Sequence, residues 1–417
     1  MGDRMSGPGL HVLVVNVFFA PHTYGGATIV AEAVAGRLRR DHGVTVSAIS
    51  VMSRADLAPY AVLRAERDGV VNHLINLPPG RSYAEHYRNP RVAERIAMLT
   101  RQLAPDIAHV HCVQEIGADA IGAIRGAGVP VILSVHDFWW LCERQFMLRP
   151  DGRYCGQHLI RIEDCRGCVD DFARAQARFE ALGAAAGAAD CVTYPSRFAR
   201  ALCEASGLAP GRGVVWSNGV RAPGPDFAAL QAARRARDPR PVFGFVGGPS
   251  AMKGWPLIQS AFSGAGRSDF RGLLVDGSMD GSWWTGRNIA ALRGDWAVCP
   301  RFDQAGMDAF YAEIDVLLFL SQWKETFGLT IREALARGIR VIQTDSGGTM
   351  EHGVREGVEV VPMGCDPAIL RGAVDRMLDD PSPMAPVAMH DVGAQAREFL
   401  GLAQRVLGAD AKVPGAA

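Results

Sequence analysis

Short apolar runs alternate with stretches of helical spacing along most of the chain, and this alternation constrains the fold more than any other feature. In the first half, the runs that we interpret as strands are 11–19, 44–51, 107–113 and 130–137. Stretches of helical spacing separate them, at 27–43, 91–103 and 117–127. This order is typical of parallel sheets, because parallel neighbours need a long crossover connection that is usually a helix. The first half therefore predicts a doubly wound α/β domain.

A second series of the same kind follows a stretch rich in Pro, Arg and Ala at 221–241, which we interpret as a linker with a short helix. Its strand-like runs are 241–248, 271–278, 296–302, 314–321, 339–346 and 357–364. With 417 residues the chain is longer than one hydrophobic core usually supports. We predict two Rossmann-like domains that face a cleft, at 1–220 and 221–390. A C-terminal helix, within 391–417, either closes the second domain or crosses back to the first.

Charge and hydropathy exclude several classes of protein. Lys and Arg total 44 and Asp and Glu total 44, so no overall field favours nucleic acid. No apolar run approaches the roughly 18 to 20 residues that cross a bilayer, and no signal-peptide cleavage site follows the first strand. We expect a cytoplasmic protein. Arg37, Arg39 and Arg40 favour a solvated helix end, and peripheral contact with the inner face of a membrane is the alternative.

The stretch "DVLLFLSQWKETFGLTIREALARGIRVIQTDSGG" at 315–348 carries two glutamates between two strands. A helix is predicted from Phe327, because apolar residues follow it at helical spacing, with Thr326 as its N-cap. Glu325 then lies at the carboxyl end of a parallel strand, where open α/β sheets bind ligands. Glu333 lies on the second turn and could reach the hydroxyls of a ribose.

The start of this helix is a candidate site for phosphate, because its first amides have no partner within the helix. The amides concerned belong to Phe327, Gly328, Leu329 and Thr330. The alternative is that both glutamates are solvated and only favour the helix N-terminus. The spacing of the two glutamates does not decide between these interpretations.

The segment "ETFGLTIREALARGIRVIQTDSGGTMEHGV" strongly resembles the donor-binding signature of GT-B glycosyltransferases in the retaining family 4 group. Other segments resemble the same family: "NVFFAPHTYGGATIVAEAVAGRLRRDHGVTV", "PDIAHVHC", "GVPVILSVHDFWWLC", "PSRFARALCEASGL" and "SNGV". The resemblance covers residues from about 10 to 410. It implies a GT-B fold and transfer of a sugar from a nucleotide-diphosphate donor to a hydroxyl of a saccharide or lipid-linked acceptor, without a required cofactor.

The resemblance also implies roles for individual residues. Glu325 would hold hydroxyls of the transferred sugar, and Glu333 would hold the ribose of the nucleotide. His136 would lie across the cleft from Glu325, beside the sugar and the acceptor oxygen; a satisfied histidine at a strand end is the alternative. Gly25 and Gly26 would let the backbone approach the diphosphate closely, although a simple turn before a helix would also need them.

Lys253 in "GGPSAMKGW" matches the lysine that the family places on the diphosphate. A fixed cation there stabilises the charge that the leaving nucleoside diphosphate gains. The chain departs from the family at Gly248, where an arginine is common. Either another cation such as Arg301 substitutes for it, or the phosphates are held more weakly. The resemblance further implies front-face attack with retention, because no carboxylate is expected close to the anomeric carbon.

Four of the nine cysteines, Cys142, Cys155, Cys165 and Cys168, follow the spacing C-x12-C-x9-C-x2-C. Four thiolates with one CxxC could form a structural zinc site, and unlinked buried thiols are the alternative. The aromatic clusters 138–140 and 282–284 favour core packing over an acceptor groove.

The alternatives to a glycosyltransferase are an oxidoreductase and a catalytically silent relative. A dinucleotide-dependent oxidoreductase would need GxGxxG after the first strand, whereas the chain has "APHTYGGAT" there. A catalytically silent relative that only binds nucleotide sugar is disfavoured by intact Glu325, Glu333, Lys253 and His136, but Gly248 leaves it open.

Overall fold

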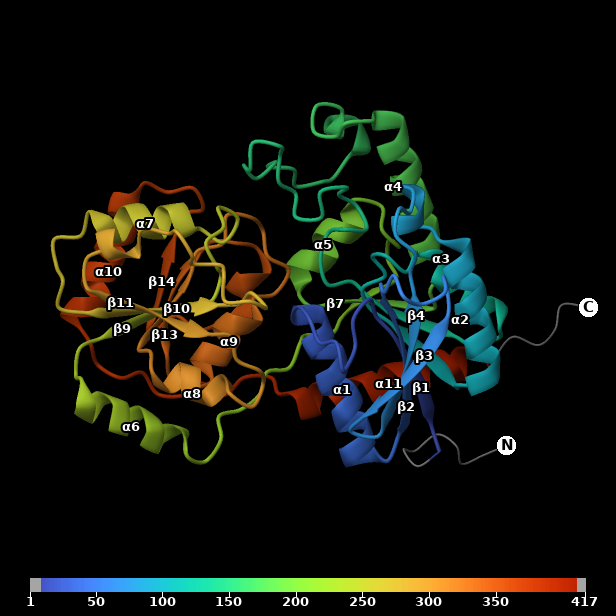
Figure 1. Ribbon diagram of the computed structural model, residues 1–417, viewed down its shortest axis with the longest axis horizontal. Helices are drawn as coiled ribbons and strands as arrows, with labels where there is room; N and C mark the ends of the chain where they lie inside the picture. Colours follow the sequence, from blue (N-terminus) through green and yellow to red (C-terminus); the bar gives the residue numbers. More distant parts are fainter. Residues whose placement is uncertain (1–8, 411–417) are drawn as a thin grey trace, which may run out of the picture. The chain divides into compact units, whose positions relative to one another are not determined.

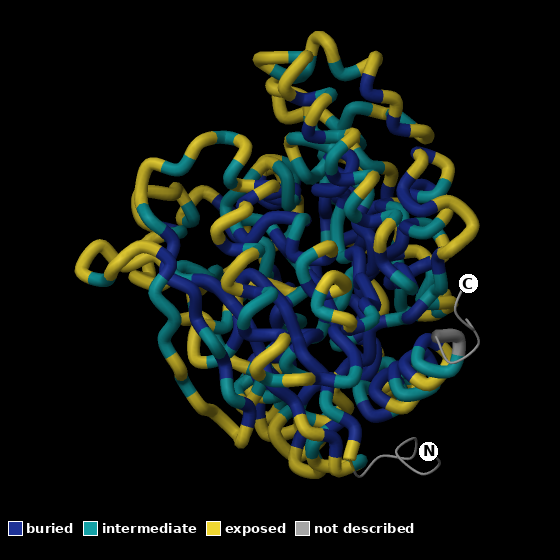
Figure 2. Tube along the Cα trace, turned by 90° about the vertical axis from the view of Figure 1, so that its right-hand side faces the viewer, coloured by how far each residue is buried: buried dark blue, intermediate teal, exposed yellow. Residues whose placement is uncertain are grey.

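The computed structural model describes residues 9–410, which form two compact units (Figure 1). The N-terminal unit contains the chain up to Phe146, Gln157–Gly219 and the chain from His390 onward. The C-terminal unit contains Met147–Gly156 and Val220–Met389. Buried segments, dark blue in Figure 2, alternate along the chain with exposed loops. Among the described helices, none is long and apolar enough to cross a membrane.

The N-terminal unit is built on an eight-stranded sheet with the order β3-β4-β2-β1-β5-β6-β7-β8. Its strands are β1 (His11–Val15), β2 (Thr45–Met52), β3 (Val62–Arg67), β4 (Val70–Asn76), β5 (Ile107–Val110), β6 (Val131–Ser134), β7 (Cys191–Tyr194) and β8 (Gly213–Val215). All neighbours are parallel except β3 and β4, which are antiparallel. The predicted α/β class with parallel sheets is therefore confirmed, with one antiparallel edge strand that was not predicted.

The helices of this unit are α1 (Gly26–His42), α2 (Pro90–Leu103), α3 (Asp119–Gly126), α4 (Phe172–Gly187), α5 (Arg197–Ala205) and α11 (Val392–Asp410). α1 buries one stripe that includes Val30, Val34 and Leu38 and ends at Gly43, whose left-handed backbone (φ 64°) donates to the last carbonyls. α11 lies beside α1 (Figure 1). The buried Gln395 of α11 accepts from Gly219 N at 2.7 Å, which fixes α11 to the segment that leaves β8.

The C-terminal unit has a six-stranded, fully parallel sheet with the order β11-β10-β9-β12-β13-β14. Its strands are β9 (Val242–Phe245), β10 (Arg271–Asp276), β11 (Asp295–Pro300), β12 (Val316–Phe319), β13 (Arg340–Thr344) and β14 (Val358–Val361). Its helices are α6 (Phe227–Arg237), α7 (Trp255–Ser263), α8 (Met307–Ala312), α9 (Leu329–Leu335) and α10 (Pro367–Asp379).

Helices cover both faces of this second sheet, as Figure 1 shows. On β12, Val316 and Leu318 join the core under α7 and α10, whereas Leu317 joins the core under α6, α8 and α9. Successive strand residues point to opposite faces, so a nearly continuous apolar run is what a strand buried on both faces requires. The predicted doubly wound architecture is confirmed here.

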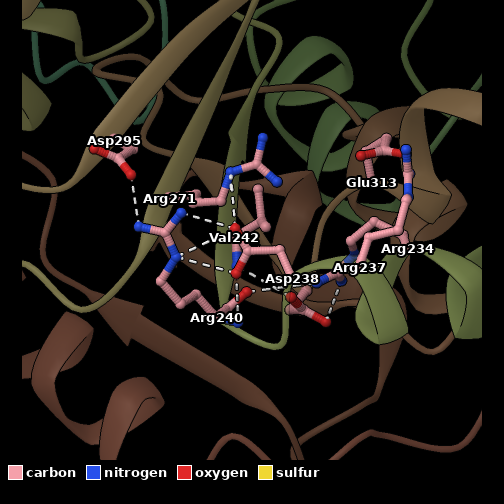
Figure 3. A network of polar contacts seen from close by, with 9 residues as sticks. Arg234, Arg237, Asp238, Arg240, Val242, Arg271, Asp295 and Glu313 are labelled. Atoms are coloured by element: carbon pink, nitrogen blue, oxygen red, sulfur yellow. Dashed lines mark hydrogen bonds and ion pairs between the residues drawn. The ribbon is translucent and has the colours of Figure 1, made fainter.

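The stretch predicted as a linker is anchored to the C-terminal unit by ion pairs. Arg234 of α6 is 1% exposed and lies 2.6 Å from Asp315, at the start of β12. Figure 3 shows the neighbouring contacts: Arg237 bonds Glu313 at 2.9 Å, and Arg240 joins Asp238 to Asp295. These contacts hold α6 at the amino ends of the strands and leave the carboxyl ends for a site.

Candidate active site

The carboxyl ends of β9 and β12 form a topological switch point in the C-terminal unit. From β9 the chain adds β10 and β11 on one side of the sheet and later β12, β13 and β14 on the other. The loops that leave the two adjacent strands therefore turn in opposite directions, and such points are where open α/β sheets bind ligands. A pocket of about 110 Å³ lies there, lined by Phe245, Gly247, Lys253, Phe319, Ser321 and Thr330 among others.

Two charged side chains meet at this pocket. Lys253 Nζ lies 2.7 Å from Glu325 Oε1, and Ser321 Oγ donates to the same carboxylate oxygen. Glu325 is 8% exposed, and these two bonds satisfy one oxygen of its buried carboxylate. Lys253 Nζ also lies 5.5 Å from the ring centroid of Trp323. The structure thus brings together Lys253 and Glu325, which the sequence separates by 72 residues.

Gly254 explains how the loop of Lys253 can reach Glu325. Its φ of 83° is left-handed, and a Cβ atom there would lie 2.1 Å from the carbonyl oxygen of Leu320. Only glycine allows this approach, because any side chain would collide with the backbone that follows β12. Gln322 N donates to Met252 O at 2.8 Å and fixes the same contact.

The backbone of Glu325 is held by the turn that follows β13. Glu325 forms a parallel bridge with Gly347, and Gly348 N donates to Glu325 O at 2.8 Å. The buried Arg332 lies between the two segments: it donates to the carbonyl oxygens of Phe327 and, at 3.2 Å, of Gly348. Its guanidinium carbon lies 3.7 Å from the ring centroid of Phe327. The buried guanidinium of Arg332 therefore helps to fix the backbone conformation of the two segments around Glu325.

The start of α9 differs from the prediction. The helix begins at Leu329, and its N-cap is Gly328 in the left-handed conformation (φ 81°), with no side-chain cap. Thr326 is therefore not the N-cap, and Thr326 and Phe327 are buried residues that precede the helix. The prediction was wrong because the N-cap preference of threonine was applied without the backbone geometry. A Cβ at Gly328 would lie 2.9 Å from the Thr349 side chain, so close packing selects glycine.

Glu333 lies on α9 and is half-buried. Tyr311 on α8 donates its hydroxyl to Glu333 Oε2 at 3.2 Å. Burial raises the pKa of Glu333, while the charge of Arg337 and the bond from Tyr311 oppose this rise. The structure places Glu333 on the same helix as Thr330 of the pocket, beside a polar cluster that the sequence did not reveal.

The space that an arginine at residue 248 would need is taken by Trp283. Gly248 has a φ of 69°, and a Cβ there would lie 2.6 Å from the Trp283 ring. A Cβ atom at Gly277, just after β10, would lie at the same distance from the same ring. Trp283 thus packs over the carboxyl ends of β9 and β10, and its neighbour Trp284 is buried and donates to Val275 O at 3.0 Å. Arg301 is exposed and contacts Met279.

His136 lies in the N-terminal unit, just after β6. Its Nε2 is hydrogen-bonded to Nδ1 of His111 at 2.8 Å, and His111 packs against the buried His109. Burial lowers the pKa of His136 to about 4 and that of His109 to about 3, so these rings are neutral at pH 7. His136 can therefore donate or accept a hydrogen bond at neutral pH, and its approach to Glu325 across a cleft stays a prediction.

Gly25 and Gly26 are both exposed, at the start of α1. Gly25 has a φ of 82°, in the left-handed region, and a Cβ there would meet nothing within 4 Å. The backbone conformation, rather than crowding, therefore favours glycine at residue 25. The open space beside it is compatible with a ligand, and the diphosphate contact stays a prediction.

The predicted zinc site finds no support. Within residues 9–410, no three His, Cys, Asp or Glu side chains are grouped so that they could hold a metal ion. Cys155 follows the bridged residues Leu148 and Tyr154, in a turn that belongs to the C-terminal unit. Cys142, Cys165 and Cys168 belong to the N-terminal unit. The spacing of the four cysteines in the sequence does not show how the loop between them folds, and therefore could not show that they lie apart.

Comparisons with known proteins agree with this architecture. The family model "Glycosyltransferase Family 4" matches residues 24–222, and "Glycosyl transferases group 1" matches residues 230–399. A comparison with curated proteins finds no match.

Several solved structures have a similar fold at low identity. Sucrose-phosphate synthase from Thermosynechococcus elongatus has a TM-score of 0.65 and 16% identity, over 97% of this chain and 98% of that chain. HepE from Anabaena in complex with UDP has a TM-score of 0.61 and 16% identity, over 97% and 99%. The catalytic domain of starch synthase IV from Arabidopsis thaliana, bound to ADP and acarbose, has a TM-score of 0.65 and 15% identity, over 96% and 99%.

Each α/β unit thus has its own family match, and the fold is shared with solved glycosyltransferases over nearly the whole chain. The chain belongs to the GT-B glycosyltransferases of the group 1 type.

Proposed function

We propose that this glycosyltransferase retains the anomeric configuration and moves a hexose-type sugar from a nucleoside-diphosphate sugar to a hydroxyl of a saccharide or lipid-linked acceptor. Its place would be in the synthesis of a polysaccharide or glycoconjugate. The observation that carries the proposal is the Lys253–Glu325 pair at the switch point of the C-terminal sheet. It supplies a cation for phosphate that lines the pocket, and a carboxylate for sugar hydroxyls 2.7 Å from that cation.

The donor class is supported by the chemistry of this pair. The ammonium group of lysine has three donors, so Lys253 can hold Glu325 and a phosphate oxygen together. A carboxylate beside it can accept hydrogen bonds from two vicinal hydroxyls of a sugar. The similar structures of HepE are complexes with UDP, with UDP and glucose, and with UDP-glucose, and that of starch synthase IV contains ADP. We therefore propose a uridine or adenosine diphosphate sugar as the first candidates.

The proposed chemistry is front-face substitution. The bond between the anomeric carbon and the diphosphate oxygen breaks, and the acceptor oxygen forms its bond on the same face. The departing phosphate oxygen takes the acceptor proton, so no separate base is needed. Lys253 stabilises the negative charge that the leaving group gains. Glu325 is already engaged by Lys253 and Ser321, which favours its role as a hydroxyl acceptor over that of a nucleophile.

We propose roles for the other residues that bind the nucleotide, the diphosphate and the sugar. Glu333 would accept from the ribose hydroxyls, and the backbone at Gly25 and Gly26 would approach the diphosphate. His136, neutral at pH 7, would hydrogen-bond the transferred sugar beside the acceptor oxygen. Because Lys253 supplies positive charge at the diphosphate, the proposed chemistry requires no additional cofactor.

The test is a panel of uridine, adenosine and guanosine diphosphate sugars with simple saccharide acceptors, measured by nucleotide release. The anomeric configuration of any product is read by NMR. We expect release from one donor, a product of retained configuration, and loss of turnover by at least 100-fold in Glu325→Gln, which corresponds to about 2.7 kcal/mol in the barrier. Inversion would contradict the mechanism. Binding of a donor with no release for any acceptor would favour the silent relative, and binding of a nicotinamide dinucleotide alone would favour the oxidoreductase.

A further inference from the structure

A polar cluster lies beside the carboxylate of Glu333, and two of its members, Tyr311 and Arg337, are buried. Tyr311 donates to Glu333 Oε2 at 3.2 Å, and the same hydroxyl lies 3.1 Å from Thr330 O. Arg337 lies beneath, with its guanidinium carbon 5.1 Å from the Tyr311 ring centroid. Two of its nitrogens donate to Asp308 Oδ1, at 2.8 and 2.6 Å. We call Tyr311, Glu333, Arg337 and Asp308 the Glu333 cluster.

Within this cluster the hydroxyl of Tyr311 is the direct partner of the Glu333 carboxylate. Arg337 is turned toward Asp308 and toward carbonyl oxygens, one of which is the backbone oxygen of Glu333 at 3.0 Å. Tyr311 and Arg337 are each 1% exposed, so water does not replace either of them. A phenol has one hydrogen to donate, and the charged carboxylate is a better acceptor than the Thr330 carbonyl.

We infer that Tyr311 is a positioning residue: its hydroxyl fixes the orientation and keeps the charge of Glu333, and thereby sets how tightly the enzyme holds the ribose hydroxyls of its donor. This inference rests on the proposed function, in which Glu333 binds ribose. Tyr311 acts through Glu333 and does not itself touch the nucleotide.

The physical reason is the burial of Glu333. Burial raises the pKa of Glu333, and two groups oppose this rise: the positive charge of Arg337 and the bond from Tyr311. Arg337 also pairs with Asp308, whereas the Tyr311 hydroxyl bonds the Glu333 carboxylate directly. A protonated Glu333 keeps fewer acceptor sites and loses the charge-assisted bond to a ribose hydroxyl. Without the Tyr311 hydroxyl, Glu333 therefore takes up a proton at a higher pH, and its rotamer is no longer fixed.

The substitution Tyr311→Phe tests this inference, because it keeps the ring that packs against Arg337 and removes only the hydroxyl. Uridine and adenosine diphosphate are titrated by calorimetry between pH 5 and 8, each beside its 2′-deoxy and 3′-deoxy forms. For the diphosphate that binds, we expect roughly tenfold weaker affinity for the ribose form, as for loss of one charge-assisted bond. The affinity for at least one deoxy form stays unchanged, and the pH at which acid weakens binding moves upward.

Tyr194→Phe is the matched control. Tyr194 is a buried tyrosine of the N-terminal unit whose hydroxyl donates to Leu208 O at 3.1 Å. Tyr194→Phe also removes one buried tyrosine hydroxyl, here bonded to a neutral carbonyl oxygen, so its stability falls while affinity and pH profile stay as in the wild type.

Equal affinities and equal pH profiles for Tyr311→Phe and Tyr194→Phe would overturn the inference. If wild type binds ribose and deoxyribose forms equally, the role of Glu333 fails, and the inference with it. If no nucleoside diphosphate binds at all, the proposed function itself is wrong. The three results are distinguishable from one another.

Discussion

At residue 248 the chain carries glycine, and the ring of Trp283 beside it gives the physical reason. The Trp283 ring lies where a side chain on Gly248 would begin, 2.6 Å from its Cβ position, and the positive φ disfavours any residue other than glycine. Lys253 remains at the pocket. The packing of Trp283 against residue 248 depends on the fold and cannot be read from residue 248 alone.

Gly248→Arg is expected to lower the stability of the chain and to leave nucleoside-diphosphate affinity unimproved. The left-handed backbone costs roughly 1 kcal/mol for a residue with a Cβ, and the clash with Trp283 adds to it. Thermal melting and calorimetry measure the two effects. The double variant Gly248→Arg with Trp283→Ala should recover part of the stability. An increase in affinity in the single variant, without loss of stability, would show that Trp283 does not occupy this space.

The charged residues of the candidate site stand out in the sequence more clearly than the residues that support them. Lys253, Glu325 and Glu333 belong to motifs whose spacing is visible in the chain, although their roles stay predictions. Tyr311 and Trp283 were not recognised as part of the site, because their contacts depend on strand order. Ordinary core packing accounts for aromatic residues in most proteins, so their sequence context did not single them out.

At the scale of elements, the loop before α9 illustrates a local rule that tertiary packing overrides. Threonine at residue 326 satisfies the N-cap preference, yet the helix starts after Gly328, and the residue before the threonine, Glu325, is held by the turn at Gly347 and Gly348. At β3 and β4, by contrast, a local rule holds: the two strands form an antiparallel hairpin that was not predicted. Asp68 and Gly69, with φ values of 50° and 70°, form the two-residue turn that favours a hairpin, so the Asp-Gly pair in the sequence is itself a signal for these two strands.

Arg332→Leu is expected to lower the free energy of unfolding by roughly 2 to 4 kcal/mol, because buried carbonyl oxygens of two loops lose their donor. It should also lower kcat more than it raises KM for the donor, since the loop that carries Glu325 loses its fixed shape. Urea denaturation and steady-state kinetics measure the two effects. Arg355→Leu, at an exposed arginine of the same unit, is the control. Equal unfolding free energies and equal kinetic constants for the two variants would show that Arg332 does not fix the loop that carries Glu325.

At the scale of the whole molecule, two βα series predicted two doubly wound sheets because strand periodicity and crossover length are local properties. The sequence did not determine which unit the helix after residue 390 belongs to. The helix after residue 390 packs with the N-terminal unit through Gln395, whose partners Gly219 and Trp216 lie more than 170 residues away. Only the three-dimensional contact identifies that partner.

Acid should destabilise the chain through its buried histidines. The folded pKa values of His109 and His136, about 3 and 4, lie below the ordinary value of 6.5. Below pH 6.5 the unfolded state therefore binds more protons, so stability is full above pH 6.5 and falls as the pH drops toward 4. Each such histidine contributes a slope of up to about 1.4 kcal/mol per pH unit.

Urea midpoints at pH 7, 6 and 5 measure this slope. His109→Asn removes one titrating ring and should flatten the dependence relative to wild type. Raised pKa values of buried carboxyls, such as that of Asp137, act in the opposite direction, so the comparison with the variant is more informative than the absolute slope. Identical slopes for wild type and His109→Asn would contradict the neutral state assigned to this histidine.

The proposed function depends on a nucleoside diphosphate binding beside Lys253. The most direct measurement is calorimetric titration of uridine, adenosine and guanosine diphosphates, with NAD as the competing ligand class, into wild type and Lys253→Met. We predict that one diphosphate binds wild type and binds Lys253→Met at least tenfold more weakly, since loss of a charge-assisted contact costs about 1.5 to 3 kcal/mol. Equal affinity of both proteins for every diphosphate, or binding of NAD alone, would contradict the account.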